Sequence, residues 1–189
     1  MTSLLRTLAL AASAIVFVFL GCGGGKVGGK AGVLKRVPVV TKLTPIEFTF
    51  PAGWYANPKV NPYDLQCMSP SEEANTGVFA FRMVDLEENA TPQSIFQEQI
   101  EDLRSKRRNF VELEKVQKQE YADKSVTTVT YRGEKDSSEN YYRFALLEFK
   151  GDTSRFAIAL QVAVPSAWST NKPVLEQIVQ SARLLPETP

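Results

Sequence analysis

The sequence predicts one α+β domain, an antiparallel sheet of about six strands with helices on both faces (an α/β/α sandwich), behind a signal peptide and a flexible linker. Three observations predict this class. Most apolar runs after residue 45 alternate with period two, which is typical of strands. Two segments, near Pro92 and after Pro173, instead place their apolar residues at helical spacing. Short polar or glycine-containing segments join the strands, which favours hairpins and antiparallel pairing.

The strand pattern recurs along the predicted domain, 45–186. Alternation slips near Lys115, which predicts a bulge or a break, and the polar segment 133–140 is expected to be a hairpin loop. In the last strand, large apolar residues alternate with three alanines and Gln161. Both faces of this strand are therefore expected to be covered by other elements. The face that carries the alanines should allow a helix to pack closely against it. The expected strands are 46–50, 65–68 (the weakest), 77–84, 110–121, 125–132, 141–150 and 155–164.

Each helix has a recognisable beginning. Thr91 is expected to be the N-cap of the first helix, with Pro92 at its first position. Pro173 is expected near the start of the second, which leaves Ser169 and Lys172 outside it. The apolar faces comprise Ile95, Phe96, Ile100 and Leu103 in the first helix, and Val174, Leu175, Ile178, Val179 and Ala182 in the second.

The first 21 residues resemble a lipoprotein signal peptide. Arg6 precedes the thirteen-residue apolar run 8–20, which has the length of a signal-peptide core and is too short to span a bilayer. Gly21-Cys22 follows and resembles the lipobox of bacterial lipoproteins. That resemblance implies cleavage after Gly21 and acylation of Cys22, for example with palmitate. The alternative is an ordinary secretory signal with an incidental cysteine.

The segment after Cys22 has the composition of a tether. Six of the ten residues 23–32 are glycine, and such a chain is costly to order. We therefore expect a lipidated cysteine with a flexible linker over 22–44, a single domain over 45–186 and a short tail over 187–189. The anchor would hold the domain on the periplasmic or extracytoplasmic side of the cell membrane or the outer membrane.

Composition excludes several kinds of chemistry. The chain has 189 residues, no histidine and two cysteines, so a histidine-based triad and a Cys/His zinc site are both excluded. The 22 Lys and Arg residues nearly balance the 21 Asp and Glu residues, which gives no electrostatic case for nucleic-acid binding. No metal, cofactor or catalytic residue is therefore assigned.

Two candidate nucleophiles, Ser169 and Cys67, also have structural interpretations. Ser169-Thr-Asn-Lys172 matches a Ser-x-x-Lys pattern, which requires both residues on one helix turn; a helix-entry loop is the preferred interpretation. Cys67 would be the one free thiol once Cys22 is acylated, but no histidine can activate it. A buried strand position is therefore favoured for Cys67.

The charged clusters have simpler interpretations. Asp85, Glu87 and Glu88 lack a calcium-loop pattern and are expected to form a solvated loop. The sequon Asn89-Ala-Thr91 is expected to be incidental, since Thr91 serves as the N-cap. The basic residues 104–108 could bind phosphate or lipid headgroups, but a helix C-terminus favours cations without any ligand.

One family resemblance goes beyond these patterns. The strand-turn segment Phe48-Thr-Phe50-Pro51-Ala-Gly53-Trp54, the Thr91-Pro92 helix and the final strand pair with its helix resemble the PsbP-like superfamily, which includes Mog, PsbP and DcrB-type proteins. The resemblance covers about 45–186 and implies a non-enzymatic domain that assists a membrane complex or binds a protein. With the predicted anchor, we expect a binding or accessory module for an envelope protein. The alternative is a small-ligand or stress-sensing module with a pocket between sheet and helix.

Overall fold

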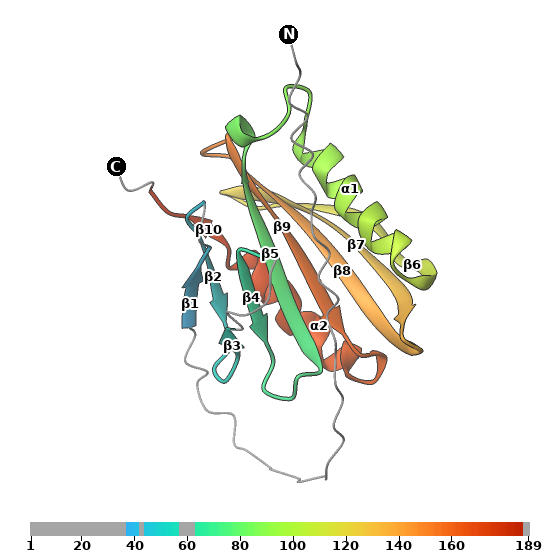
Figure 1. Ribbon diagram of the computed structural model, residues 1–189. Helices are drawn as coiled ribbons and strands as arrows, with labels where there is room; N and C mark the ends of the chain where they lie inside the picture. Colours follow the sequence, from blue (N-terminus) through green and yellow to red (C-terminus); the bar gives the residue numbers. More distant parts are fainter. Residues whose placement is uncertain (1–36, 42–43, 57–62, 187–189) are drawn as a thin grey trace.

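The part of the chain that the structure describes folds into two antiparallel sheets and two α-helices (Figure 1). The computed structural model describes residues 37–41, 44–56 and 63–186. The predicted signal peptide (1–21), Cys22 and the predicted tail (187–189) lie outside these residues. The predicted α+β class with a mainly antiparallel sheet is confirmed. Within the described ranges, neither helix is long and apolar enough to cross a membrane.

A seven-stranded sheet occupies the centre of the described fold. All its neighbouring strands are antiparallel. After β5 in the middle of the sheet, α1 (Pro92–Ser105) leads the chain to the edge strand β6, and β6 to β9 then form a meander back to β5. In sheet order the strands are β3 (Tyr55–Ala56), β4 (Leu65–Met68), β5 (Ala74–Arg82), β9 (Arg155–Ala163), β8 (Ser138–Phe149), β7 (Lys124–Lys135) and β6 (Arg108–Glu120).

A separate three-stranded sheet corrects two predictions. It consists of β1 (Val37–Val40), β2 (Ile46–Phe50) and β10 (Arg183–Leu184), so β2 is not part of the main sheet as a single six-stranded sheet would require. The predicted linker 22–44 also extends too far, because β1 pairs with β2 along its full length. β10 comes from the far end of the chain, and the residue pattern of such a short strand does not reveal which strand it pairs with.

The motif that carries the family resemblance forms a tight turn after β2. Trp54 N–H donates to the Pro51 carbonyl (3.2 Å), and Gly53 has φ of 86°, a value that favours glycine. Trp54 then packs against the core, with its ring centroid 5.8 Å from that of Phe50. Gly53 thus permits the tight turn, and Trp54 covers part of the core.

The hairpin predicted at 133–140 is confirmed, but its loop is much shorter than predicted. β7 and β8 pair as far as Lys135 and Ser138, so only Asp136 and Ser137 remain in the turn. Both turn residues have positive φ, 51° and 66°, as a two-residue hairpin of type I′ requires. This end of the hairpin carries polar residues on both faces. Its amino-acid composition is therefore similar to that of a typical loop.

The helix starts were predicted correctly in one case and incorrectly in the other. Thr91 caps α1: its hydroxyl accepts from Ser94 N–H (3.0 Å), and Ser94 Oγ accepts from Thr91 N–H (2.9 Å). The second helix, α2 (Pro165–Gln180), begins eight residues before Pro173, which lies inside it. Pro173 and Ser169 are exposed, so water can bond the Ser169 carbonyl that Pro173 leaves without a helical donor.

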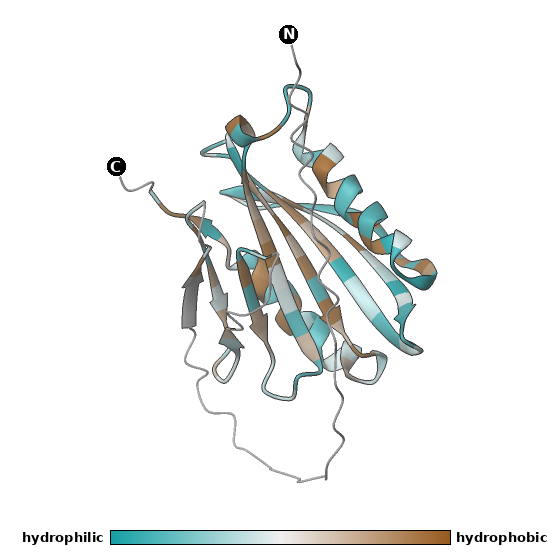
Figure 2. Ribbon diagram, in the orientation of Figure 1, coloured by the Kyte–Doolittle hydropathy of each residue, from teal (hydrophilic) through white to brown (hydrophobic). Residues whose placement is uncertain are grey.

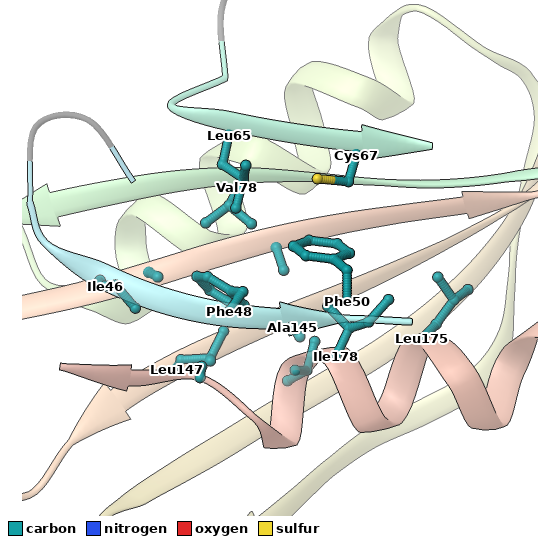
Figure 3. Close-up of a cluster of buried hydrophobic side chains, with 14 of the residues drawn as sticks. Ile46, Phe48, Phe50, Leu65, Cys67, Val78, Ala145, Leu147, Leu175 and Ile178 are labelled. Atoms are coloured by element: carbon teal, nitrogen blue, oxygen red, sulfur yellow. The ribbon is translucent and has the colours of Figure 1, made fainter. Parts of the chain in front are cut away.

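Two buried clusters use alternate residues of the central strands. Phe144 and Leu146 of β8 belong to the cluster that contains α1, whereas Ala145 and Leu147 belong to the cluster that contains α2 and β2. The small residues of β9 fall in the α2 cluster, as the alternation predicted. Figure 3 shows part of this cluster, with Phe48 and Phe50 of β2 close to Leu147 and Ile178. The α2 cluster includes Ala157, Ala159 and Ala163 of β9, Leu175, Ile178 and Val179 of α2, and Ile46, Phe48 and Phe50 of β2.

The irregularity predicted near Lys115 is confirmed. The β6–β7 register shifts between Glu112 and Glu114 and again between Glu114 and Gln117. Bulges re-aim side chains on an otherwise regular strand. Glu114 is half-buried although the residues beside it in β6 are exposed, and its carboxylate belongs to the site described next.

Candidate functional site

A row of polar side chains crosses five strands of the main sheet. Thr76 pairs with Gln161, Gln161 with Arg143, Arg143 with Thr130, and Thr130 with Glu114, from β5 to β6. Directly paired residues of antiparallel strands point to the same face. Figure 2 shows hydrophilic segments that interrupt the mostly hydrophobic strands β5, β9 and β8. The row therefore forms one continuous polar track across the sheet.

Gln161 is the fully buried centre of this row. Its Nε2 donates to the Leu175 carbonyl of α2 (2.7 Å) and lies 3.4 Å from Thr76 Oγ1. Both acceptors require the amide nitrogen on that side, so the amide cannot flip. Its Oε1 is consequently directed at Arg143.

Arg143 is a buried cation that the sheet holds in a fixed position. Its side chain is only 7% exposed, and Nη1 donates to Gln161 Oε1 at 2.6 Å. Among the described residues, no carboxylate lies within 4.0 Å of it. Burial lowers the pKa of the guanidinium, while the more distant Glu176 and Glu114 carboxylates act in the opposite direction. The side chain remains protonated because its ordinary pKa is so high.

Glu114 and Lys172 form the outer end of the row. Lys172 Nζ of α2 donates to Glu114 Oε1, and Thr130 Oγ1 donates to Glu114 Oε2 at 2.8 Å. Burial alone would raise the pKa of Glu114, but these two hydrogen bonds outweigh it and the pKa is lowered. Glu176 approaches Lys172 less closely, at 4.0 Å. Glu114 is thus an ionised carboxylate whose charge Lys172 largely neutralises.

A pocket of about 320 Å³ opens between these groups, beneath α2 and beside β6, β7 and β8. Val126 and Val179 contribute apolar wall. The pocket has both signs of charge, with one more cation than carboxylate. The charged side chains that line it are Glu114, Lys118, Arg143, Lys172 and Glu176.

Cys67 occupies a buried position, as expected. It lies on β4 within the α2 cluster, and Figure 3 shows its sulfur inside the packed side chains. Burial raises the pKa of the thiol to about 12. The thiolate needed for nucleophilic chemistry is therefore scarce at neutral pH.

We expect Cys67 to resist thiol reagents in the folded protein. At pH 8, a coloured disulfide reagent should label essentially no thiol of a Cys22→Ser variant without denaturant and about one thiol per chain in strong denaturant, because burial blocks both ionisation and access. The time course of absorbance measures this directly. Rapid labelling of the native protein would contradict the buried assignment.

The Ser-x-x-Lys pattern lies in a different setting from the predicted one. Ser169 and Lys172 are both on α2, not in an entry loop before it, because the helix begins at Pro165. The lysine nevertheless does not act on the serine: its amine bonds Glu114, and Ser169 is exposed. The hydrogen bond of Lys172 therefore goes to a carboxylate, whereas a general base would have to lie within hydrogen-bond reach of the serine hydroxyl.

The acidic residues after β5 form an exposed segment. Asp85 pairs with Arg82 at 2.8 Å, and Glu87 and Glu88 are exposed. Within the described residues, no group of three or more acidic or cysteine side chains is placed to hold a metal ion.

The basic residues at the end of α1 do not form one patch. Arg104 lies over the Phe110 ring, 5.7 Å from its centroid, and Lys106 pairs with Asp102. Arg107 Nε donates to the Tyr142 hydroxyl at 2.9 Å. Three of the four cations, Arg104, Lys106 and Arg107, thus have structural partners, and Arg108 is exposed.

The sequence patterns missed Arg143. Its strand was recognised, but the charge was not singled out. The sequence does contain an indication of this site. Arg143 shares a strand face with Tyr141, Ala145 and Leu147, which are mostly apolar. In the next strand, Gln161 likewise interrupts a row of alanines. A charge at a buried strand position is expected to have a partner or a function.

The fold defines the class of domain to which this chain is similar. No protein-family model matches it, and no curated protein sequence does. The fold is PsbP-like: cyanobacterial PsbP (CyanoP) from Synechocystis sp. PCC 6803 superimposes with a TM-score of 0.59 at 15% identity, over 88% of this chain and 99% of the other.

Two further solved structures share the architecture. LpqN from Mycobacterium tuberculosis, involved in cell envelope biogenesis, has a TM-score of 0.59 at 12% identity, over 82% of this chain and 93% of its own. The Ran-binding protein Mog1p from Saccharomyces cerevisiae has a TM-score of 0.54 at 10% identity, over 80% and 96%. Likeness at such low identity establishes the fold and not a shared activity.

Proposed function

We propose that this protein is a non-enzymatic accessory module of the cell envelope, anchored in a membrane through lipid on Cys22, that binds an envelope protein. The similarity of the fold to LpqN and Mog1p supports this class of role, because one is described in envelope biogenesis and the other binds Ran. The settings of the two candidate nucleophiles also favour it. Cys67 is buried, and Lys172, the candidate base for Ser169, donates a hydrogen bond to Glu114.

The observation that carries the proposal is the exposed edge strand β6. It ends the strand order of the main sheet, so its outer N–H and C=O groups face no strand within the described ranges. Three apolar side chains on this edge are exposed: Val111 (46%), Leu113 (42%) and Val116 (56%). A free edge with apolar side chains fits an extended segment that adds as a further strand.

The bulges in β6 restrict where such a segment can pair. They interrupt the strand between Arg108 and Val111 and on both sides of Glu114, so a partner segment is expected to pair in short stretches rather than across the whole strand. Lys115 and Lys118 are exposed on the same strand. A partner segment with a few acidic and several β-branched residues would complement this edge.

Charge substitutions on β6 test the partner surface. Val111→Lys and Val116→Lys should each reduce capture of the envelope partner about tenfold or more, because a lysine cannot be desolvated cheaply at the interface. Val84→Lys is the matched control, since Val84 is exposed (82%) and lies away from β6. The measurement is quantitative crosslinking in intact envelopes; equal capture by all three variants would refute the edge as the docking surface.

Anchoring has a separate test. Labelled palmitate should enter the wild-type protein and the Cys67→Ala variant but not Cys22→Ala, and only Cys22→Ala should leave the membrane fraction. Two or more acyl chains on one residue attach a protein stably to a membrane. A chain without acyl groups lacks this anchor. Labelling of Cys22→Ala at the wild-type level would exclude lipidation at this residue.

A second candidate function is the binding of a small ligand. The polar pocket beside Arg143 favours it specifically, because a buried cation without a carboxylate partner is a costly feature in a purely structural domain.

A further inference from the structure

We propose that the pocket beneath α2 binds a small monocarboxylate, with Arg143 as the group that recognises the carboxylate. The proposal goes beyond the docking role of β6 and does not depend on it, since the pocket and the β6 partner edge are tested with different variants.

Arg143 is prepared for such a ligand by its surroundings. Gln161 fixes one edge of the guanidinium with a 2.6 Å hydrogen bond and is itself fixed by the Leu175 carbonyl. The guanidinium lines the pocket. A planar fork of donors held in one orientation matches the two oxygens of a carboxylate.

The neighbouring charges leave Arg143 as the cation available to a ligand. Lys172 bonds Glu114, and Lys118 pairs with Glu120 at 3.4 Å. A carboxylate from the ligand would therefore neutralise a buried charge for which the described residues supply no ion-pair partner. This offsets the desolvation cost that burial of Arg143 imposes.

The same charges select against more highly charged anions. Glu114 and Glu176 line the pocket along with Arg143, so a phosphate group carrying nearly two charges would be placed beside two carboxylates. A monoanion meets less of this repulsion than a dianion and still pairs with Arg143. The ligand class is thus a carboxylate rather than a phosphate.

The volume and the lining of the pocket determine the expected size and apolar part of the ligand. A volume of about 320 Å³ admits a small molecule of a few carbon atoms. Val126 and Val179 supply apolar contact for a short carbon chain, while the charged groups lie around them. Butyrate has both parts, a single carboxylate and a short apolar chain, and it serves as the probe.

The test is a titration of the purified protein with sodium butyrate at constant ionic strength, followed by amide chemical shifts. Saturable shifts at pocket residues are expected in the wild type. Arg143→Met should weaken binding at least about tenfold, because it removes the charge-assisted fork, and its amide spectrum verifies the fold. Arg132→Met, at an exposed arginine of β7, should leave binding unchanged.

A second variant keeps the proposal open to refutation if Arg143→Met fails to fold. Glu176→Gln removes a repelling carboxylate and should tighten butyrate binding about threefold or more. Unchanged or weaker binding by Glu176→Gln would overturn the proposal. So would equal butyrate binding by Arg143→Met, shifts confined to residues outside the pocket, or inorganic phosphate binding at the same pocket residues as tightly as butyrate.

Discussion

Replacement of Gln161 by leucine is expected to lower the free energy of unfolding by about 2–3 kcal/mol. The two side chains are close in volume, so the loss arises from hydrogen bonding rather than from a cavity. Arg143 would lose the acceptor at 2.6 Å that its buried guanidinium uses, and Nε2 would no longer hold the Leu175 carbonyl. Urea unfolding followed by tryptophan fluorescence measures the change.

Gln66 offers a matched control for this substitution. It is also buried, but its Oε1 has no hydrogen-bond partner among the described residues. Gln66→Leu removes an unsatisfied polar atom and should therefore change the free energy of unfolding by less than about 1 kcal/mol, or raise it.

A double variant identifies the cause of the Gln161 effect. Arg143→Met combined with Gln161→Leu should recover most of the lost stability, because two apolar groups can replace a buried polar pair with little cost. If the double variant is as unstable as the sum of its parts, the Gln161–Arg143 contact is not what stabilises this region.

The larger effect is expected in the cluster that contains α1. Phe144→Ala should lower the free energy of unfolding by about 3–5 kcal/mol, since it leaves a cavity in the densely packed α1 cluster. Phe144 is 1% exposed, and its ring meets Phe96 of α1 edge-on with centroids 6.3 Å apart. Urea titration again provides the measurement.

The α1 interface itself can be isolated by a double-mutant cycle. Phe96→Ala and Phe144→Ala together should cost less than the sum of the single losses by about 0.5–1.5 kcal/mol, the range found for aromatic pairs. Val84→Ala, at an exposed residue, should stay within about 0.5 kcal/mol of the wild type. A loss of less than about 1 kcal/mol in Phe144→Ala would show that this ring is not part of a packed core.

Local patterns predicted most of the elements of this fold. Thr91 and Pro92 begin α1 as expected, because a cap and a first-turn proline act within four residues. The start of α2 was predicted incorrectly because Pro173 resembles a helix start, while exposure of the Ser169 carbonyl, which makes an internal proline tolerable, depends on how the helix packs. The short strands β1 and β10 could not be predicted, since each is held by β2 rather than by its own residues.

The candidate site was the least predictable feature. The row from Thr76 to Glu114 draws one residue from each of five strands, and β-strand register decides which residues become neighbours. A shift of one residue in any pair would turn Arg143 away from Gln161. The bulge near Lys115 was predicted from the sequence, but its consequence, the position of Glu114 beneath Lys172, was not.

By itself the sequence determined the class of fold, the presence of its longest strands, the cap of α1 and the buried position of Cys67, because these depend on local periodicity and side-chain chemistry. The tertiary structure alone decided that β2 belongs to a second sheet, that α2 begins at Pro165 and that Arg143 lies buried beside a pocket. The physical reason is the same in each case. Pairing between distant strands and packing against distant helices fix these features, and a linear pattern of residues does not encode which distant segments meet.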